Sequence, residues 1–544
     1  MRHFALPGRY AWAVYLFVVT LACIAWYHQV WSDGIIGLFD WRKDEFYLAY
    51  LIGSLREQGM VPTAFFAVPA NFEYPTLAVT RLYFANPEVL YYSPFLGLAR
   101  LLSSESFFLA LLGIHLALAA LGIYGIGRHF RLALVFRVFA FVLIVLNPWL
   151  MQHLAIGYGP WFNALLVPLV VWLLLSGREL PLALGAAALV SALMVYQGGF
   201  HIWLWMNMAI AAIAISLALM AGSRGIVLRT ALYGSLTVLA ATPRLLAIGR
   251  AFAGFRRDVI ASYASLSDLF GLLLDTTTNP YQLPDAYDVY GTHFYDGSLV
   301  MGPAWLVALA AACLLVVQRV LRCPSAGRLS AALLVSATIF VAFGWDGVWR
   351  SMVSGLPLLS AEIYPWRFLI VAVTLLTFLT LYEFAQFYST HGRAGKAFAL
   401  LACLAMVPSN YARNEAFVDL AAAGESSYER FNLLQFLRER LPAEERETHR
   451  PVPPRMVSDH LIYPPSARGY LLPWLTRPQL GSFVFSGASV EVDAVSGQTR
   501  TTASERPFVV SARPLVAVHE VALPLVLFAL LQAGALLKWR RRPG

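Results

Sequence analysis

The stretch Asp40-Trp41-Arg42-Lys43-Asp44-Glu45-Phe46-Tyr47 concentrates charge in a chain that has little of it elsewhere. Five charges fall within six positions, whereas charged residues make up only 13% of the sequence. A long apolar run, Tyr10 to Trp31, precedes the stretch. Carboxylates beside a membrane span are costly unless they are used, so Asp40, Asp44 and Glu45 are candidate catalytic acids. The alternative is a solvated helix start, where acidic side chains offset the helix dipole.

The composition places this stretch in a membrane protein. The chain has 544 residues, of which 59% are hydrophobic, and its mean hydropathy is +0.63. Repeated apolar runs of roughly 20 residues predict an all-α polytopic membrane protein with about twelve transmembrane helices. The expected spans are residues 11–31, 106–127, 132–150, 161–176, 180–196, 201–221, 230–248, 298–318, 329–345, 366–387, 396–410 and 518–537.

The charges predict an orientation. The net charge of +9 comes largely from arginines in every second short loop, which the positive-inside rule assigns to the cytoplasm. We therefore expect a multi-pass protein of a bacterial cytoplasmic (inner) membrane, with both termini cytoplasmic and the active site on the periplasmic face. Nucleic acid is not an expected partner. The four cysteines have neither CxxC nor Cys/His spacing, which argues against a disulfide framework and a zinc site.

Three parts are expected along the chain. Residues 1–410 form the transmembrane module, with long outer loops at 32–105 and 249–297. Residues 411–516 are predicted to form a small periplasmic α+β domain, and residues 517–544 a final transmembrane helix with a basic cytoplasmic tail. Within the small domain, helical spacing covers 425–441, and strand-like alternation covers 482–495 and 501–511 around a turn at 496–498.

Two arginines are candidate ligands for a phosphate. Arg367 opens its span from the outer side within Tyr364-Pro-Trp-Arg-Phe368, and Arg244 lies near the outer end of another span. A guanidinium matches phosphate oxygens with two parallel donors, so both are predicted to bind the phosphate of a lipid donor. The alternative for each is that the side chain reaches out to lipid headgroups.

Four further residues complete the predicted substrate site. Tyr91 and Tyr92 end the first outer loop, and the alternative to sugar stacking is an aromatic belt at the membrane interface. His201 and Glu362 lie at the outer ends of two spans. For most of the scattered histidines, which are His115, His153 and His201, we expect a core or interface role.

These residues carry a family resemblance. The run Asp44-Glu45 through Gly59 to Pro62 resembles the first outer loop of GT-C glycosyltransferases, which include aminoarabinose transferases and protein O-mannosyltransferases. Tyr91 to Phe95, Asn147 to Pro168, Pro365 to Phe368 and the tethered C-terminal domain are similar to the YfhO-like bacterial branch. The motifs are short, although the similarity in architecture covers most of the chain.

The resemblance implies a transferase that takes a sugar from a polyprenyl-phosphate carrier, such as undecaprenyl phosphate, on the outer face. Asp44 would be the general base and Glu45 its neighbour, with Asp40 as a second candidate for the base. Membrane lipids and a glycan, lipid or protein acceptor of the cell envelope would be its other partners. No cofactor is expected with certainty, and a divalent metal is left open because no acidic metal-binding set stands out in the second loop.

Two other functions remain open at the level of sequence. One is a flippase or other transporter of lipid-linked glycans, which would need a polar path across the membrane. The other is a non-catalytic membrane subunit that presents residues 411–516 to a partner. The donor sugar, the acceptor and the oligomeric state are not encoded in any recognisable motif.

Overall fold

A computed structural model describes the helices of the chain and the strands near its C-terminus. The described residues are 8–27, 48, 51–53, 55–56, 61, 83–155, 159–176, 182–251, 262–274, 299, 301–353, 355, 359, 364–423, 455–457, 460–463, 471–476, 483–486, 490–492, 498–501, 508–512 and 518–540.

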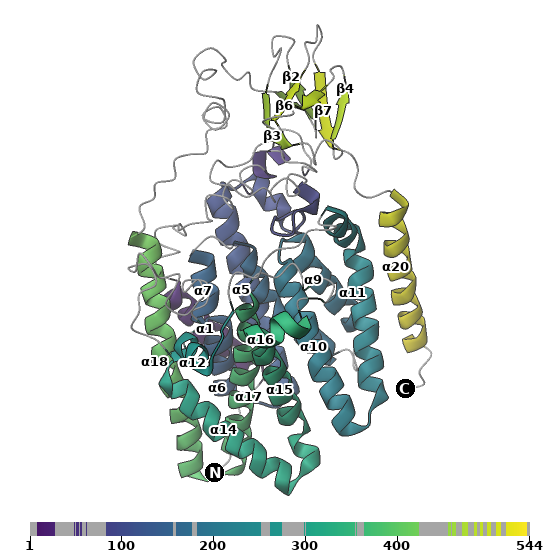
Figure 1. Ribbon diagram of the computed structural model, residues 1–544. Coiled ribbons are helices and arrows are strands. Elements are labelled where there is room, and N and C mark those ends of the chain that lie inside the picture. Colours follow the sequence, from purple (N-terminus) through teal and green to yellow (C-terminus); the bar gives the residue numbers. More distant parts are fainter. Residues whose placement is uncertain are drawn as a thin grey trace.

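The described chain is a bundle of long helices with strands beyond one of its ends (Figure 1). The helices of the bundle are α1 (Gly8–Trp26), α5 (Ser104–His129), α6 (Leu134–Ala140), α7 (Pro148–Ala155), α8 (Val167–Ser176), α9 (Ala183–Tyr196), α10 (Phe200–Ala221), α11 (Arg224–Ala251), α14 (Pro303–Arg322), α15 (Pro324–Gly344), α17 (Phe368–Thr390), α18 (Arg393–Ala423) and α20 (Val518–Arg540). Shorter helical segments are η1 (Tyr83–Ala85), η2 (Leu96–Arg100), η3 (Phe141–Val145), η4 (Gly159–Leu166), α12 (Leu266–Leu274), α16 (Asp346–Val348), η5 (Trp349–Val353) and η6 (Pro365–Arg367).

Several of these helices can cross a membrane. Among the described residues, seven helical segments are long and apolar enough, and four shorter apolar helices accompany them. The chain is therefore a multi-pass membrane protein of the helical class. Our expectation of about twelve spans exceeds the seven long ones and stays a prediction.

The spans expected at 132–150 and 161–176 are not uniform helices. The first is divided among α6, the wider turn η3 and α7, and the second begins as the tighter 3₁₀ segment η4 before α8. Asn147 starts α7, because its side-chain Oδ1 accepts a hydrogen bond from the Trp149 backbone N–H at 3.1 Å. The η4 segment contributes side chains to the site described below.

Small residues and one buried ion pair hold the spans together. A Cβ at Gly122 of α5 would lie 2.4 Å from the backbone of Pro168 and Leu169, so these helices pack in backbone contact. In the C-terminal half of α17, the buried Glu383 accepts a hydrogen bond from the Ser330 hydroxyl of α15. The Glu383 carboxylate also lies 2.9 Å from the Arg319 guanidinium of α14. Three spans are thus joined through one carboxylate.

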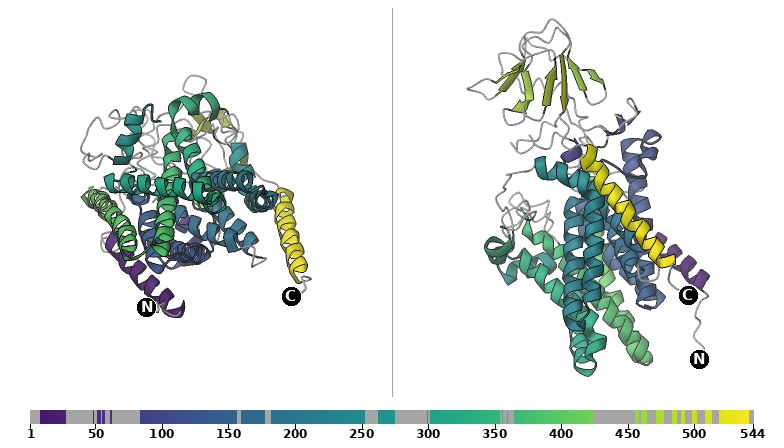
Figure 2. Two further views of the ribbon diagram at one scale, coloured as in Figure 1. Left: turned by 90° about the horizontal axis from the view of Figure 1, so that it is seen from below. Right: turned by 90° about the vertical axis from the view of Figure 1, so that its right-hand side faces the viewer.

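The two ends of the bundle differ. The α10–α11 and α14–α15 turns, the start of α1 and the end of α20 lie at one end, and the strands lie beyond the other (Figures 1 and 2). Near the strand end, both guanidinium nitrogens of Arg250 in α11 donate to the Glu520 carboxylate, which fastens α20 to α11. The turns at the first end carry Arg224, Arg319, Arg322 and Arg328.

The strands form two small antiparallel sheets. They are β1 (Arg455–Val457), β2 (His460–Tyr463), β3 (Leu471–Thr476), β4 (Phe483–Ser486), β5 (Val490–Val492), β6 (Gln498–Thr501) and β7 (Phe508–Ala512). One sheet has the order β1-β2-β7-β4 and the other β3-β6-β5. The alternation at 482–495 and 501–511 correctly indicated strands, but each region contributes to both sheets, because β4 pairs with β7 while β5 pairs with β6. Gln498, predicted to lie in the turn, is instead the first residue of β6. The helix expected at 425–441 lies outside the described residues, so the α+β class of this part stays a prediction.

Candidate functional site

Arg367 stands immediately before α17, in the 3₁₀ turn η6. Pro365 opens this turn with a fixed φ, and the Arg367 backbone N–H donates to the Tyr364 carbonyl at 3.0 Å. Only 6% of the residue is exposed. A guanidinium keeps its charge even in such surroundings, so this turn places a permanent cation inside the protein.

Aromatic rings surround that cation. The guanidinium carbon lies 4.4 Å from the ring centre of Tyr364, 5.5 Å from that of Trp161 and 5.9 Å from that of Trp366. The face of each ring is electron-rich, so it attracts the charge that burial would otherwise make costly. Arg367 is thus held by segments on both sides of the bundle, η4 and η6.

His153 extends the arrangement on the far face of Trp161. The two rings are parallel within 8°, with centres 3.7 Å apart. Because a carbonyl oxygen can only accept, His153 Nδ1 donates its proton to the Trp149 carbonyl at 2.6 Å. The Trp149 ring itself lies 5.9 Å from Trp161.

His201, a residue predicted from the sequence, contacts a further tryptophan, Trp205. Its ring centre is 5.9 Å from that of Trp205, which is 5.5 Å from Trp161 and 6.2 Å from Phe368. Arg367 and His201 are therefore linked through the neighbouring rings of Trp161 and Trp205. We call the following set the Arg367 cluster: Trp149, His153, Trp161, His201, Trp205, Tyr364, Trp366 and Arg367.

The Arg367 cluster is rich in hydrogen-bond donors. Among the described residues, the buried indole N–H groups of Trp149, Trp205 and Trp366 meet no acceptor. Buried polar groups are normally paired, and an indole can only donate. Such a cluster suits a ligand that has many acceptor oxygens and a negative charge.

Arg244 has a different environment from Arg367. It is fully buried in α11, and its NH2 nitrogen donates to the carbonyls of Asn86 and Val89, each at 2.7 Å. Its NH1 nitrogen donates to the carbonyl of Tyr196, the last residue of α9. These bonds tie the end of the first outer loop to two helices.

Tyr91 and Tyr92 lie in the loop that Arg244 holds. Their backbone N–H groups both donate to the Tyr196 carbonyl, at 2.8 and 3.1 Å, and the Tyr91 ring centre is 5.7 Å from the Arg244 guanidinium carbon. Tyr91 is half-buried, whereas 52% of Tyr92 is exposed. The loop thus presents Tyr92 at the surface and packs Tyr91 inward.

The turn between α9 and α10 carries a buried polar network. Gln197 Nε2 donates to Ser93 Oγ at 2.9 Å, and Gln197 Oε1 lies 3.1 Å from His115 Nε2. Asn163 of η4 donates to the Gln197 carbonyl at 3.2 Å. His115 is therefore a buried core residue, as expected for most of the histidines. Since Trp161 and Asn163 share η4, this short segment connects the network to the Arg367 cluster.

Four predicted residues lie outside the described part of the chain: Asp40, Asp44, Glu45 and Glu362. Their roles stay predictions. Within the described residues, no three His, Cys, Asp or Glu side chains gather as metal ligands would.

Trp149, Trp161 and Trp205 were not singled out as site residues from the sequence, and His153 was assigned a core or interface role. The spacing of these residues in the sequence could have identified them. Trp149 and His153 are four residues apart on one helix, and so are His201 and Trp205 on another. Residues at this spacing share a helix face, so the pattern predicts paired rings on two faces.

Comparisons with known proteins give one structural resemblance to report. No protein-family profile matches the sequence, and no curated protein is detectably similar to it. The cryo-EM structure of arabinofuranosyltransferase AftD from Mycobacteria resembles this fold with a TM-score of 0.44 and 16% sequence identity. The match covers 78% of this chain and 27% of AftD, so the chain spans about a quarter of that protein's length.

Proposed function

We propose that this chain is an integral-membrane glycosyltransferase that moves a sugar from a polyprenyl-phosphate carrier to an acceptor on the outer face of the membrane. The observation that carries the proposal is the Arg367 cluster, in which a buried guanidinium lies among aromatic rings with His201 nearby. The GT-C resemblance of the sequence supports the same reaction class. Within the GT-C glycosyltransferases, we propose that the chain belongs to the YfhO-like branch.

The cluster suits the leaving group of such a reaction. As the sugar departs, negative charge grows on the carrier phosphate, and fixed positive charge in a dry site stabilises it. The Arg367 guanidinium can meet two phosphate oxygens at once, and the indole N–H groups of Trp149, Trp205 and Trp366 are suited to phosphate or sugar oxygens. The aromatic faces offer apolar surface to a sugar ring.

The proposed base is Asp44. An acceptor hydroxyl oxygen attacks the anomeric carbon as the bond to the phosphate oxygen breaks, and the hydroxyl proton passes to the carboxylate. A single displacement inverts the anomeric centre, so one carboxylate suffices where retaining glycosidases use two. Glu45 would support Asp44 through hydrogen bonds, and Asp40 is the alternative base.

The remaining predicted residues take supporting parts in the proposal. Because the guanidinium of Arg244 donates to three backbone carbonyls, we propose that Arg244 holds the loop of Tyr91 and Tyr92 and does not bind the phosphate. Tyr92 would then face the substrate from the loop, and Glu362 would act beside Arg367. The site and residues 411–516 are proposed to face the periplasm.

The role of Arg367 is tested by replacing its guanidinium group with the ammonium group of lysine. Arg367→Lys keeps the charge but loses the planar pair of donors, so we expect transfer from polyprenyl-phosphate sugars to fall on the order of 10²-fold or more. The matched control is Arg350→Lys, because Arg350 is exposed in η5 and lies outside the cluster. A fully active Arg367→Lys variant would remove Arg367 from the site.

The same preparation separates the alternative functions. In proteoliposomes, movement of a labelled carrier across the bilayer without sugar transfer would assign the chain to transport. Repeating the transfer assay with a chelator decides whether a divalent metal takes part.

A further inference from the structure

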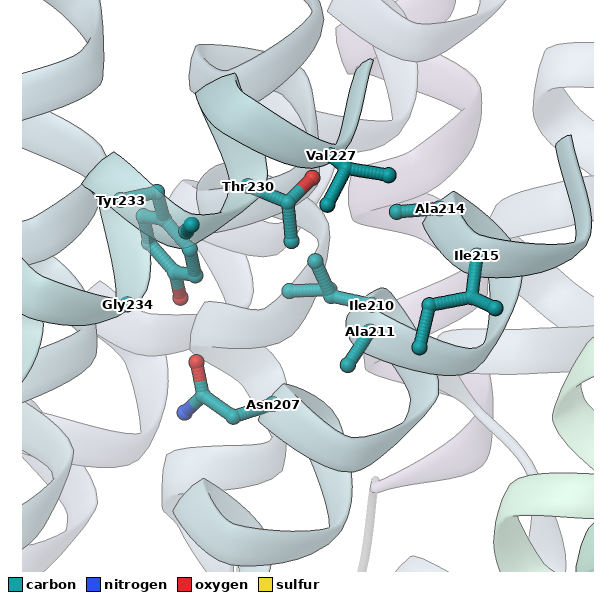
Figure 3. A pocket seen from close by; sticks show the side chains of 10 residues that line it. Asn207, Ile210, Ala211, Ala214, Ile215, Val227, Thr230, Tyr233 and Gly234 are labelled. Carbon is teal, nitrogen blue, oxygen red and sulfur yellow. The ribbon is translucent and has the colours of Figure 1, made fainter. Parts of the chain in front are cut away.

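A groove of about 250 Å³ runs between α10 and α11 (Figure 3), and none of its lining residues belongs to the Arg367 cluster. Its lining is almost entirely apolar and comes from these two helices alone. The lining residues are Asn207, Ile210, Ala211, Ala214, Ile215, Val227, Thr230, Ala231, Tyr233 and Gly234.

Small side chains create this groove. Ala211 and Ala214 of α10 and Ala231 and Gly234 of α11 all line the groove, and their short side chains leave the space between the two helices unfilled. At one end of the groove, the oxygens of Asn207 and Tyr233 turn toward each other in Figure 3. The groove therefore has apolar walls and one polar end.

Arg224 stands at the other end, in the first turn of α11. Val227, Ala231 and Gly234 follow it by three, seven and ten residues, a spacing that places all four on one helix face. Val227 is three residues away, or about 4.5 Å along the helix axis. Arg224 is exposed, and within the described chain its guanidinium has no acidic partner.

The surroundings of the groove are those of a lipid-facing surface. Both helices are long and apolar enough to cross a membrane. Leu219 beside the groove is 80% exposed and Leu228 is 70% exposed, which suits contact with hydrocarbon chains. A cation at the mouth of an apolar intramembrane groove is complementary to a lipid with a negative headgroup.

We propose that this groove binds one acyl chain of an anionic glycerophospholipid, whose phosphate is held by Arg224. The carrier of the proposed reaction is a less suitable occupant. Trp205, which belongs to the Arg367 cluster, is in the first turns of α10, whereas Arg224 follows the far end of that helix, roughly 30 Å away along its 22 residues. A phosphate at Arg367 therefore leaves Arg224 unoccupied, and the lipid site does not depend on the proposed activity.

Photo-crosslinking in lipid nanodiscs tests the proposal. The probes are phosphatidylglycerol and phosphatidylcholine with a diazirine on one acyl chain, and mass spectrometry identifies the labelled peptides. We expect phosphatidylglycerol to label α10 and α11 around the groove about fivefold more than phosphatidylcholine does, the preference that one interfacial cation typically gives.

Two pairs of variants distinguish binding of the acyl chain in the groove from binding of the headgroup by Arg224. Ala231→Phe fills the groove and should abolish the labelling there, whereas Leu232→Phe, at an exposed neighbouring position off the groove, should not. Arg224→Gln should remove the preference for phosphatidylglycerol, whereas Arg322→Gln, at the exposed last residue of α14, should preserve it. Circular dichroism checks that each variant folds.

The proposal fails on either of two results. Equal labelling by both probes, unaffected by Arg224→Gln, would show a groove that any lipid fills. Undiminished labelling in folded Ala231→Phe would show that the chain lies elsewhere.

Discussion

Arg244 and Arg367 are both buried arginines, but their surroundings indicate different roles. Arg244 donates to three backbone carbonyls, whereas Arg367 lies among aromatic rings. Arg244→Lys leaves buried carbonyls unpaired, which costs about 1–3 kcal/mol per group. We therefore expect Arg244→Lys to lower the melting temperature and raise KM with little change in kcat, and Arg367→Lys to lower kcat at an unchanged melting temperature. Thermal unfolding and steady-state kinetics of both variants check this, and identical behaviour would refute the division of roles.

The sequence could identify Arg367 and His201 as candidates because a cation and a histidine at the ends of apolar runs stand out. It could not show that Arg244 holds a loop, since the carbonyls of Asn86, Val89 and Tyr196 carry no side-chain signal. Nor could it show which rings surround Arg367, because Trp161 is more than 200 positions away in the chain. Contacts of this kind depend on tertiary packing.

At the scale of helices, the turn from α9 to α10 is the most constrained element. Gly198 has φ +85°, and a Cβ there would lie 2.8 Å from the backbone of Glu88. Gly222, which ends α10, also has a left-handed φ of +60° but no atom within 4 Å of its Cβ position. Gly198→Ala should therefore destabilise the protein well beyond the roughly 1 kcal/mol of backbone strain expected for Gly222→Ala. Equal melting temperatures for the two variants would contradict this account of the turn.

The ion pair that joins α14, α15 and α17 gives a second prediction at this scale. Glu383→Ala leaves Arg319 and Ser330 without their shared carboxylate, and breaking such a buried pair costs about 3–5 kcal/mol. The exposed Arg322→Ala provides the control. Denaturant unfolding in detergent measures both, and a loss below that of the control would show that the pair contributes no stability.

The apolar runs placed the long helices well, because hydropathy alone specifies a span. Residues 201–221 correspond to α10 within one residue at the start, and 106–127 lie within α5. The sequence did not reveal the changes of helix type at η3 and η4, because hydropathy does not distinguish π and 3₁₀ turns from α-helix. It also did not reveal that β4 pairs with β7 and β5 with β6, because alternation sets faces but not partners.

At the scale of the whole molecule, the prediction concerns orientation. Cys323 is exposed in the turn between α14 and α15, and the hydrogen bond with the Ser325 hydroxyl lowers the pKa of its thiol, which favours the reactive thiolate. If the basic turns face the cytoplasm, a membrane-impermeant maleimide should label Cys323 only after spheroplasts are permeabilised. Cys323→Ser supplies the background, and labelling in intact spheroplasts would reverse the proposed topology.

Sugar transfer itself is measured most directly by incubating the purified protein with a panel of polyprenyl-phosphate sugars and comparing three variants of the acidic stretch. We predict transfer from at least one carrier by the unmodified protein. Asp44→Asn should still bind that carrier but transfer on the order of 10²–10⁴ times more slowly, with milder losses for Asp40→Asn and Glu45→Gln. If all three variants kept full turnover, or if the unmodified protein transferred no sugar from any carrier, the chain would not be the glycosyltransferase proposed here.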